Sequence, residues 1–388
     1  MVTKIVSNPP DTSNLGEIQA EVVHITEPLE LLSGQRLLDH VLCVETYGQL
    51  NKNKSNAVLI CHALTGSHHA AGWHAGDKKP GWWDSIIGPG KSIDTEQFFV
   101  VSPSNIGTCH GSTGPLSINP KTNSAWGPNF PKLHISDWTA SQRMLMDHYK
   151  IKCWAAVVGG SLGGMQAMHW SVAYPSRLLS AIVIASAMKL SAQNIAFNEI
   201  ARRAIKEDPD FLKGYYHENK KKPLKGLALA RMIGHVTYLS DLSMAEKFGR
   251  ELRNGDFLDE KSESVEFKIE SYLNYQGDKF AYEFDANSYI LLTKMLDYFD
   301  LALEYNNEPS TAFELASCKF LVLTFSSDWR FPPERSREIT KALITAGRDV
   351  THAEISSSQG HDAFLLPNSR YQKIFSTFLQ RIASNVNY

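Results

Sequence analysis

A serine flanked by glycines is the strongest chemical signal in this sequence. Ser161 lies in the string Gly159-Gly160-Ser161-Leu162-Gly163, directly after the apolar run 154–158 and before a run typical of a helix. A β-branched run, a G-x-S-x-G turn and a helix form the pattern of a nucleophile elbow, which exposes a serine hydroxyl. The glycines are needed because the turn is strained and because strand and helix pass close together. Ser161 is therefore the candidate nucleophile.

A serine nucleophile needs a base, and the base needs an orienting carboxylate, which follow the elbow serine in the order acid, then histidine. Asp328 follows the apolar run 320–325, and His361 follows the run 350–355, so both lie on loops after strand-like segments. We predict Asp328 as the acid and His361 as the base. His352 is an alternative base, but it lies inside a strand-like run, and Asp328 could instead cap a helix.

Acyl transfer also needs N–H donors for the oxyanion that develops on the substrate. The residue after an elbow nucleophile supplies one backbone donor, which here is Leu162. The loop after an early strand supplies the second, and we predict the backbone N–H of Leu64, which follows the run 57–61.

Histidines continue along the same loop at His68, His69 and His74. Imidazoles are common zinc ligands, but no acidic motif such as H-E-x-x-H accompanies these three. The serine, aspartate and histidine described above already account for hydrolytic chemistry. We therefore expect no metal site.

Asp362 and Arg231 are candidates for binding substrate. Asp362 adjoins the predicted base, so its carboxylate could accept a substrate ammonium or hydroxyl group, and the alternative is a helix cap. Arg231 shares one helical face with Leu227, His235 and Tyr238. If that face points inward, Arg231 could bind a carboxylate through two hydrogen bonds, and otherwise it lies in solvent.

Short apolar runs bounded by turn residues recur along the chain and alternate with helix-like segments. The predicted strands are 40–47, 57–62, 98–102, 154–158, 179–185, 320–325 and 350–355, and helices are expected at 136–149 and 333–346. This alternation predicts an α/β fold with a mostly parallel sheet flanked by helices on both faces.

Helical spacing replaces the strand pattern between residues 191 and 307, where we expect helices over 192–206, 224–239, 265–276 and 287–300. We predict a helical insertion, 191–307, that forms a lid over the active site, and a catalytic domain made of 1–190 and 308–388. Such an insertion emerges at the sheet edge whose loops carry the chemistry.

Composition excludes several classes of function. The chain has 388 residues, 43% of them hydrophobic, and a formal net charge of -2, so no basic surface for nucleic acid or anionic membrane is expected. No apolar run reaches the roughly 20 residues of a membrane span, and residues 1–11 lack a signal-peptide core. The 5 cysteines are odd in number and widely spaced, which is typical of reduced core residues. We expect a cytoplasmic protein that acts on small molecules.

The chain resembles the homoserine O-acyltransferases, which are α/β-hydrolase enzymes of methionine biosynthesis. The resemblance is carried by HALTGSHHAAG (from His62), PGWWDSIIGPGK (from Pro80), GSTGPLSINP (from Gly111), VVGGSLGGMQAMHW (from Val157), LSAQNIAFNE (from Leu190), LARMIGHVTYLS (from Leu229), SDWRFPPERS (from Ser327) and GHDAFLLP (from Gly360). It implies an α/β-hydrolase fold with Ser161, Asp328 and His361 as the triad. It also implies that Arg231 and Asp362 bind the amino-acid substrate and that the chain forms a homodimer through the helical insertion.

The resemblance implies a two-step reaction in which the serine takes an acyl group from acyl-CoA and passes it to the hydroxyl of L-homoserine, with no cofactor beyond this co-substrate. Members that resemble proteobacterial succinyltransferases carry Asp-Trp-Arg-Phe where many acetyltransferases have an apolar residue in place of the arginine. Here the string reads Asp328-Trp329-Arg330-Phe331. We expect Arg330 to meet the distal carboxylate of succinyl-CoA, and the alternative is an ion pair with Glu334. Acetyl-CoA as donor, serine as acceptor and an esterase activity remain open alternatives.

Overall fold

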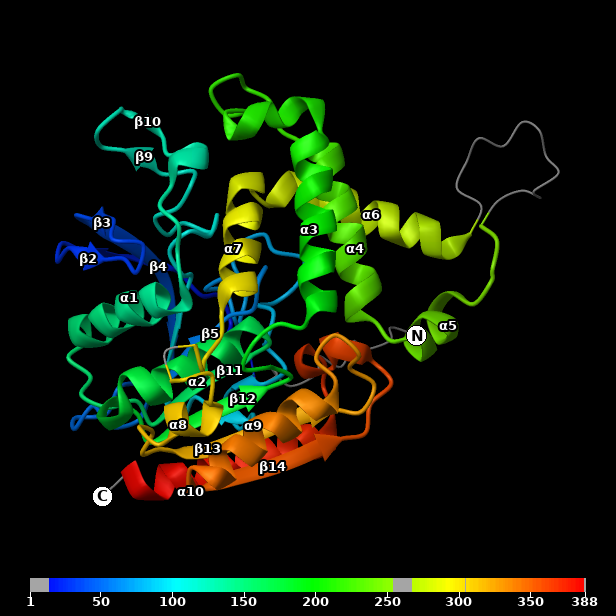
Figure 1. The fold of residues 1–388 in the computed structure, drawn as a ribbon. Coiled ribbons are helices and arrows are strands. Elements are labelled where there is room, and N and C mark those ends of the chain that lie inside the picture. Colours follow the sequence, from blue (N-terminus) through cyan, green and yellow to red (C-terminus); the bar gives the residue numbers. More distant parts are fainter. Residues whose placement is uncertain (1–13, 254–266, 304, 387–388) are drawn as a thin grey trace, which may run out of the picture.

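An eight-stranded sheet forms the centre of the protein in the computed structural model (Figure 1), which describes residues 14–253, 267–303 and 305–386. The strands lie in the order β1 (Glu21–Ile25), β4 (His40–Tyr47), β8 (Phe99–Pro103), β5 (Ala57–Cys61), β11 (Ala156–Gly160), β12 (Ser180–Ile184), β13 (Lys319–Phe325) and β14 (Val350–Ile355). From β8 to β14 all neighbours are parallel, whereas β4 pairs antiparallel with both β1 and β8. The predicted α/β fold with a mostly parallel sheet is confirmed.

Helices cover both faces of this sheet. Residues alternate along β13, so that Phe320 and Val322 join one apolar core while Leu321 and Leu323 join the other. The helices outside the insertion are α1 (Ile135–His148), α2 (Leu162–Ala173), α8 (Pro309–Phe313), α9 (Pro333–Thr345) and α10 (Ser369–Val386). The first core contains α1, α2 and α9, and α10 packs into the second core, on the opposite face.

Short strand pairs complete the structure around the sheet. They are β2 (Leu29–Glu30) with β3 (Arg36–Leu37), β6 (Ile87–Gly88) with β7 (Ile93–Asp94), and β9 (Ile118–Asn119) with β10 (Ser124–Ala125). The seven strands predicted from apolar runs all form, with ends shifted by at most two residues. The edge strand β1 was not predicted.

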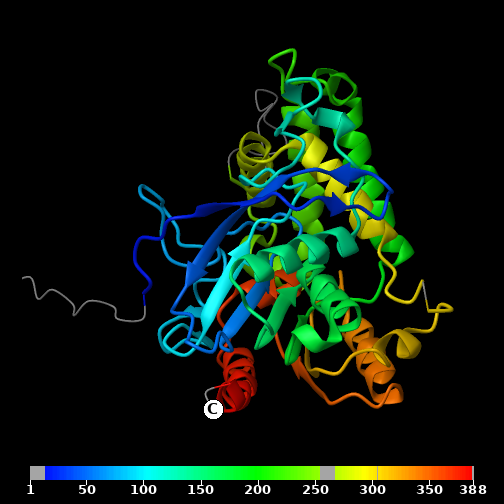
Figure 2. The ribbon, with the colours of Figure 1, turned by 90° about the vertical axis from the view of Figure 1, so that its left-hand side faces the viewer.

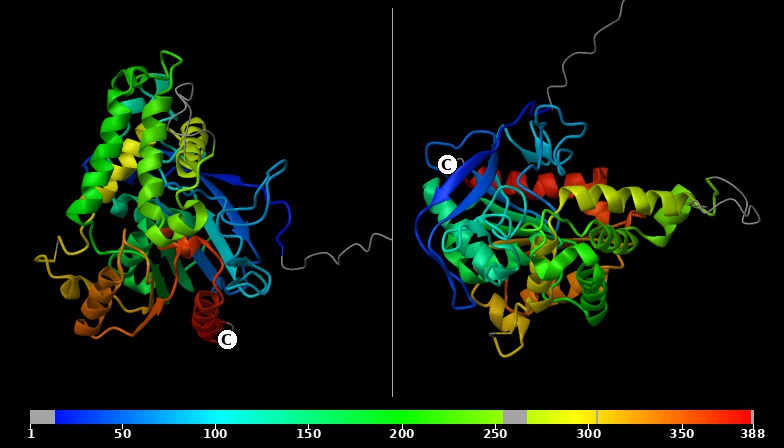
Figure 3. Two further views of the ribbon diagram at one scale, coloured as in Figure 1. Left: turned by 90° about the vertical axis from the view of Figure 1, so that its right-hand side faces the viewer. Right: turned by 90° about the horizontal axis from the view of Figure 1, so that it is seen from above.

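The described residues of the predicted insertion, 191–307, are mainly helical. The insertion contains α3 (Ala192–Glu207), α4 (Leu224–Tyr238), α5 (Asp241–Phe248), α6 (Lys268–Glu283) and α7 (Ala286–Tyr298). Figure 2 and the left panel of Figure 3 show α3, α4 and α7 at the end of the molecule away from α10, and seen from above α6 projects outward. Residues 254–266 and 304 of the predicted insertion lie outside the described residues, and so do residues 265–266 of the helix expected at 265–276.

None of the helices in the described part of the chain is long and apolar enough to cross a membrane. All five cysteines are free thiols.

Candidate active site

The elbow that carries Ser161 joins β11 to α2. Ser161 has φ 56° and ψ -121°, a conformation that L-residues rarely adopt and that is typical of strained functional turns. The Ser161 N–H donates to the Ile184 carbonyl at 2.9 Å, and the Ser161 carbonyl accepts from the Ser186 hydroxyl at 2.7 Å. A methyl group on Gly159 would lie 2.2 Å from the carbonyl carbon of Gly163, so the close approach of strand and helix requires glycine.

Asp328 and His361 form a buried pair. Nδ1 of His361 donates to Oδ2 of Asp328 at 2.7 Å, and the exposed fractions of the two side chains are 5% and 0%. The other oxygen, Oδ1, accepts from the N–H groups of Arg330 and Phe331 at 3.0 and 2.8 Å. The backbone therefore orients the carboxylate, and the carboxylate orients the imidazole so that Nε2 is available as a base. A helix-capping role of Asp328 would explain the hydrogen bonds to Oδ1 but not the hydrogen bond between Oδ2 and His361.

Aromatic rings hold the histidine loop against the elbow. The ring centres of Phe331 and Phe364 lie 5.1 and 5.6 Å from that of His361. A Cβ on Gly160 would lie 2.5 Å from the Phe364 ring, so the loop with the base packs directly on the last residue of β11. His352, the alternative base, lies inside β14 opposite Val322.

The predicted oxyanion donors lie on adjoining segments. Leu162 is the first residue of α2, so its N–H has no carbonyl acceptor in a preceding helical turn. Among the described residues no backbone acceptor contacts the N–H of Leu64. A Cβ on Gly163 would lie 2.0 Å from the carbonyl oxygen of Cys61, which shows how tightly the elbow helix packs against the start of the Leu64 loop.

Buried amides behind the elbow form a network that the sequence did not reveal. The Gln166 side chain donates to the carbonyls of His62 and Leu162, at 3.1 and 3.3 Å, and accepts from Asn105 at 3.0 Å. The Gln142 amide donates to Oδ1 of Asn105 at 2.7 Å and to Oε1 of Gln166 at 2.8 Å. The network thus joins the elbow helix to residues 62–66, which contain the predicted oxyanion donor Leu64 and are called the oxyanion loop below. A glutamine in the mostly apolar helix α2 was the signal that could have found it.

His62, at the start of the oxyanion loop, is held by the same network. Its Nδ1–H donates to the Ala63 carbonyl at 2.8 Å, and its Nε2 accepts from the Asn105 N–H at 3.1 Å. Burial lowers the pKa of His62 to about 4, so the ring stays neutral at neutral pH.

Arg231, on α4, points inward and not into solvent. Its Nη1 lies 3.5 Å from the Thr65 hydroxyl, on the oxyanion loop, and its guanidinium carbon lies 4.9 Å from the centre of the Phe280 ring. Its Nε is buried without a hydrogen-bond partner among the described residues. No carboxylate of the described chain lies within ion-pair distance of Arg231. This guanidinium is therefore available to a ligand.

Arg330 is buried and lacks a charged partner. Its Nη1 donates to the Thr237 hydroxyl at 2.8 Å and its Nη2 to Asn198 at 3.4 Å, and its exposed fraction is 7%. The predicted alternative, an ion pair between Arg330 and Glu334, is wrong, because Glu334 pairs with Arg337 of α9. In the described part of the chain no carboxylate lies within ion-pair distance of Arg330.

Tyr238 connects these groups and was not singled out from the sequence as a site residue. Its ring centre lies 5.8 Å from the guanidinium carbon of Arg231, 5.4 Å from that of Arg330 and 6.2 Å from the ring centre of His361. Both arginines therefore lie near the predicted base. Its place on the helical face of Arg231 was the available signal.

Asp362 lies beside the base without a hydrogen-bond donor in the described chain. Burial raises the pKa of its carboxyl group, and the positive charges of His361, Arg231 and Lys247 act in the opposite direction. The helix-cap alternative is wrong, because Asp362 lies inside the short 3-10 helix Gly360–Leu365, whose N-cap residue is Gln359. A half-buried carboxylate next to the predicted base is a suitable partner for a substrate ammonium.

Comparisons with known proteins agree with this arrangement. A family model described as the alpha/beta hydrolase fold matches residues 56–366. A homoserine O-succinyltransferase from Cellvibrio japonicus is 60% identical over 370 residues, covering 95% of this chain and 97% of that protein. One from Saccharophagus degradans is 58% identical over 371 residues, with the same coverage of 95% and 97%. The chain belongs to the homoserine O-acyltransferase family of α/β hydrolases.

The fold of this chain is similar to solved structures of two kinds of enzyme. A homoserine O-acetyltransferase from Bacillus anthracis superposes with a TM-score of 0.86 at 28% identity, covering 94% of this chain and 98% of that one. Esterase E22 superposes with a TM-score of 0.84 at 29% identity, covering 93% and 100%. The fold is therefore shared with an esterase. The fold alone does not distinguish acyl transfer from hydrolysis, so the groups around the predicted triad must do so.

Proposed function

We propose that this protein transfers a succinyl group from succinyl-CoA to the side-chain hydroxyl of L-homoserine through an acyl-enzyme on Ser161, giving O-succinyl-L-homoserine for methionine biosynthesis. The observation that carries the proposal is the set of three charged groups without charged partners, Arg231, Arg330 and Asp362, around the predicted triad. Relatives that are 54–60% identical and named homoserine O-succinyltransferase support the same substrates.

In the first half-reaction the Ser161 hydroxyl attacks the thioester carbonyl while Nε2 of His361 takes its proton. Asp328 stabilises the resulting imidazolium. The N–H groups of Leu64 and Leu162 would donate to the oxyanion. The C–S bond then breaks, and His361 returns the proton to the departing thiolate, which leaves as CoA.

In the second half-reaction the homoserine hydroxyl attacks the ester carbonyl on Ser161 and gives its proton to His361. The bond between the acyl carbon and Oγ of Ser161 breaks, and the proton passes from His361 to Oγ, which restores the enzyme. Arg231 binds the carboxylate of homoserine and Asp362 binds its ammonium. Acyl-CoA serves as a co-substrate, and the proposed mechanism needs no other cofactor.

Arg330 supports succinyl-CoA over acetyl-CoA as the donor. A guanidinium that is 7% exposed and has only neutral partners can pair with the distal carboxylate of a succinyl group. An acetyl group offers no such carboxylate. Serine differs from homoserine by one methylene, so discrimination between these acceptors depends on a few contacts.

We also propose that the insertion, 191–307, acts as a lid and as a dimer interface, and that the enzyme works in the cytoplasm. Helices α4 and α6 carry exposed apolar side chains, including Leu229 at 50%, Val236 at 42% and Tyr275 at 64%, which supports an interface there. The free cysteines support a reducing compartment. Leu229→Asp should lower the molar mass measured by light scattering to that of one chain, and an unchanged mass would contradict an interface at this residue.

Incubation of the purified protein with succinyl-CoA, with and without homoserine, tests the proposed reaction. Sustained thiol release should require homoserine, and mass spectrometry should identify O-succinyl-homoserine and, without acceptor, a chain heavier by one succinyl group. Ser161→Ala should abolish both signals. Thiol release that continues without homoserine would instead support an esterase, the activity named for the structural neighbour.

A further inference from the structure

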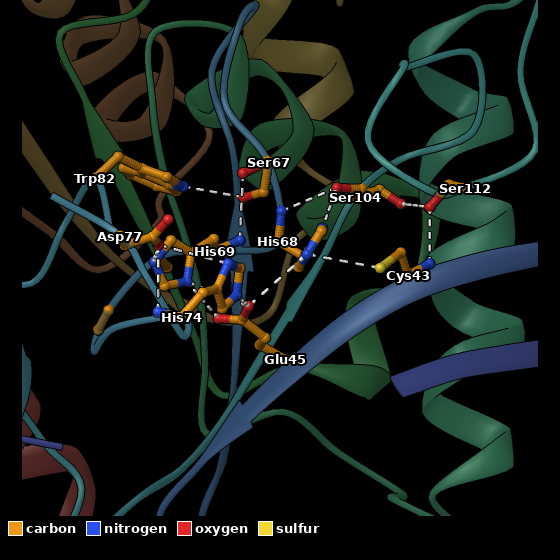
Figure 4. A network of polar contacts seen from close by, with 12 residues as sticks. Cys43, Glu45, Ser67, His68, His69, His74, Asp77, Trp82, Ser104 and Ser112 are labelled. Atoms are coloured by element: carbon orange, nitrogen blue, oxygen red, sulfur yellow. Dashed lines mark hydrogen bonds and ion pairs between the residues drawn. The ribbon is translucent and has the colours of Figure 1, made fainter. Parts of the chain in front are cut away.

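The loop after β5 brings its histidines against a buried carboxylate that is distant in sequence (Figure 4). Nε2 of His74 lies 2.5 Å from Oε1 of Glu45, Nδ1 of His69 lies 3.0 Å from Oε2, and Nε2 of His68 lies 3.7 Å from Oε1. Glu45 is on β4, and its side chain is 0% exposed. The sequence showed no acidic motif such as H-E-x-x-H around these histidines, and the fold supplies a buried carboxylate from β4.

Neighbouring groups orient the carboxylate and one imidazole. The Tyr47 hydroxyl donates to Oε2 of Glu45 at 2.5 Å and accepts the N–H groups of Ala70 and Ala71. Nδ1 of His68 lies 2.9 Å from the Ser104 hydroxyl, so its Nε2 faces Glu45. Hydrogen bonds to the nitrogen opposite the metal and to the ligating carboxylate are typical of metal sites.

Among the described residues, one imidazole nitrogen of this cluster lacks a hydrogen-bond partner, and Nε2 of His68 has only a weak one, Sγ of Cys43 at 3.6 Å. Nε2 of His69 is buried without a hydrogen-bond partner in the described chain, although Oδ2 of Asp77 lies 3.5 Å away. Nδ1 of His74 also lies 3.6 Å from that oxygen. A proton on Nδ1 of His74 would face Asp77 and leave Nε2, on the Glu45 side, with a free lone pair.

We propose that Glu45, His68 and His74 bind one divalent transition-metal ion, with Zn²⁺ as the best chemical match. One ligand atom from each of the three lies within 4.8 Å of the others. Zinc–ligand bonds of about 2.0–2.2 Å place two ligands of one ion roughly 3–4 Å apart, so the His68–Glu45 separation already fits. The ion would replace the hydrogen bond between His74 and Glu45.

The donor set selects the kind of metal. Two imidazoles and one carboxylate suit zinc, whereas Mg²⁺ and Ca²⁺ prefer all-oxygen sites. The proposed Ser161 chemistry does not pass through this ion. His68 follows the oxyanion donor Leu64 on one loop, so the ion would join that loop to β4 and stabilise it.

Metal analysis and zinc titration of the whole protein test the site. After chelation and dialysis, calorimetry should show one Zn²⁺ per chain, and Zn²⁺ but not Mg²⁺ should raise the melting temperature. Co²⁺ should give the visible absorption of a tetrahedral or five-coordinate site, and Zn²⁺ should remove it. Absence of stoichiometric Zn²⁺ binding and of a Co²⁺ spectrum in the wild-type protein would overturn the proposal without any variant.

Variants assign the ligands. Ser104→Ala removes the hydroxyl beside Nδ1 of His68 and should weaken zinc binding about 10- to 100-fold. Glu45→Gln and His74→Gln remove ligands, so each should weaken zinc binding more than that. His24→Gln, at an exposed histidine of β1, is the matched control and should bind zinc like the wild type. Circular dichroism checks that the variants fold. Equal zinc affinity in wild type and both ligand variants would mean adventitious binding and would overturn the assignment.

Discussion

Replacing Arg330 with methionine tests how the protein chooses its acyl donor. Methionine keeps the apolar stem and removes the charge and the hydrogen bonds to Thr237 and Asn198. The Thr237 hydroxyl still donates to the Gly234 carbonyl at 2.8 Å, so no hydroxyl proton is left unpaired. The variant should therefore fold, and its defect should appear in its reaction with succinyl-CoA.

The size of the defect follows from the contact that is lost. A hydrogen bond to a charged group contributes about 1.5–3 kcal/mol. Since about 1.4 kcal/mol corresponds to a tenfold change, kcat/KM for succinyl-CoA should fall about 10- to 100-fold. Acetyl-CoA has no distal carboxylate, so its kcat/KM should change little. The ratio between the two donors is the quantity to measure, because any loss of folded protein cancels from it.

The assay follows thiol release from each CoA ester at saturating homoserine in Arg330→Met and in the wild type. Arg337→Met is the control, because Arg337 lies on α9 with exposed carboxylate partners and should leave the ratio unchanged. If Arg330→Met lowered kcat/KM equally for both donors, the guanidinium would have only a structural role. The argument for succinyl-CoA from Arg330 would then fail.

Three further predictions concern the elbow, the acceptor and pH. Ser161→Gly should lose all acyl transfer yet unfold at a higher temperature than Ser161→Ala in calorimetry, because glycine relieves backbone strain that costs about 1–3 kcal/mol; an equal or lower melting temperature would contradict strain at φ 56°. Asp362→Asn should raise KM for homoserine about tenfold or more with little change in KM for succinyl-CoA, and equal changes in both would remove Asp362 from acceptor binding. The pKa of His62 is lowered from 6.5 to about 4, so the unfolded chain takes up a proton that the folded chain does not as pH falls through this range. At about 1.4 kcal/mol per pKa unit, the free energy of unfolding should fall by about 3 kcal/mol as the pH is lowered from 6.5 to about 4. In urea titrations His62→Gln should lack this part of the pH dependence. If the variant and the wild type showed the same pH dependence, the attribution to His62 would be refuted.

The local part of the fold was predictable from the sequence because short-range physics decides it. Strands buried on both faces appear as continuous apolar runs, which explains why β4, β5, β8, β11, β12 and β13 were found. The seventh predicted strand, β14, is more exposed. The elbow around Ser161 was found from its local G-x-S-x-G string, in which a side chain on Gly159 would collide with Gly163 four residues later. Asp328 and His361 followed from topology, because the carboxyl ends of parallel strands lie at one edge.

Contacts between distant segments were not predictable. Glu45 lies more than 20 residues before His68, and no periodicity connects β4 to that loop. The amides of Asn105, Gln142 and Gln166 come from three segments and meet only after the elbow helix packs. Tyr238 depends on how the insertion packs against the base. Each of these requires tertiary packing, which a single sequence pattern does not contain.

The choice between water and an amino-acid hydroxyl as acceptor is not made by the triad, because an esterase superposes on this chain with a TM-score of 0.84. We propose that the charged groups around the predicted triad make this choice. A buried guanidinium without a counter-charge destabilises a folded protein by several kcal/mol, and Arg330 is 7% exposed with only neutral partners. An ester hydrolase with apolar substrates would gain nothing that offsets this cost. In the proposed reaction the distal carboxylate of the donor would pair with Arg330 and the zwitterionic acceptor with Arg231 and Asp362, and these charges would be supplied only while the substrates are bound.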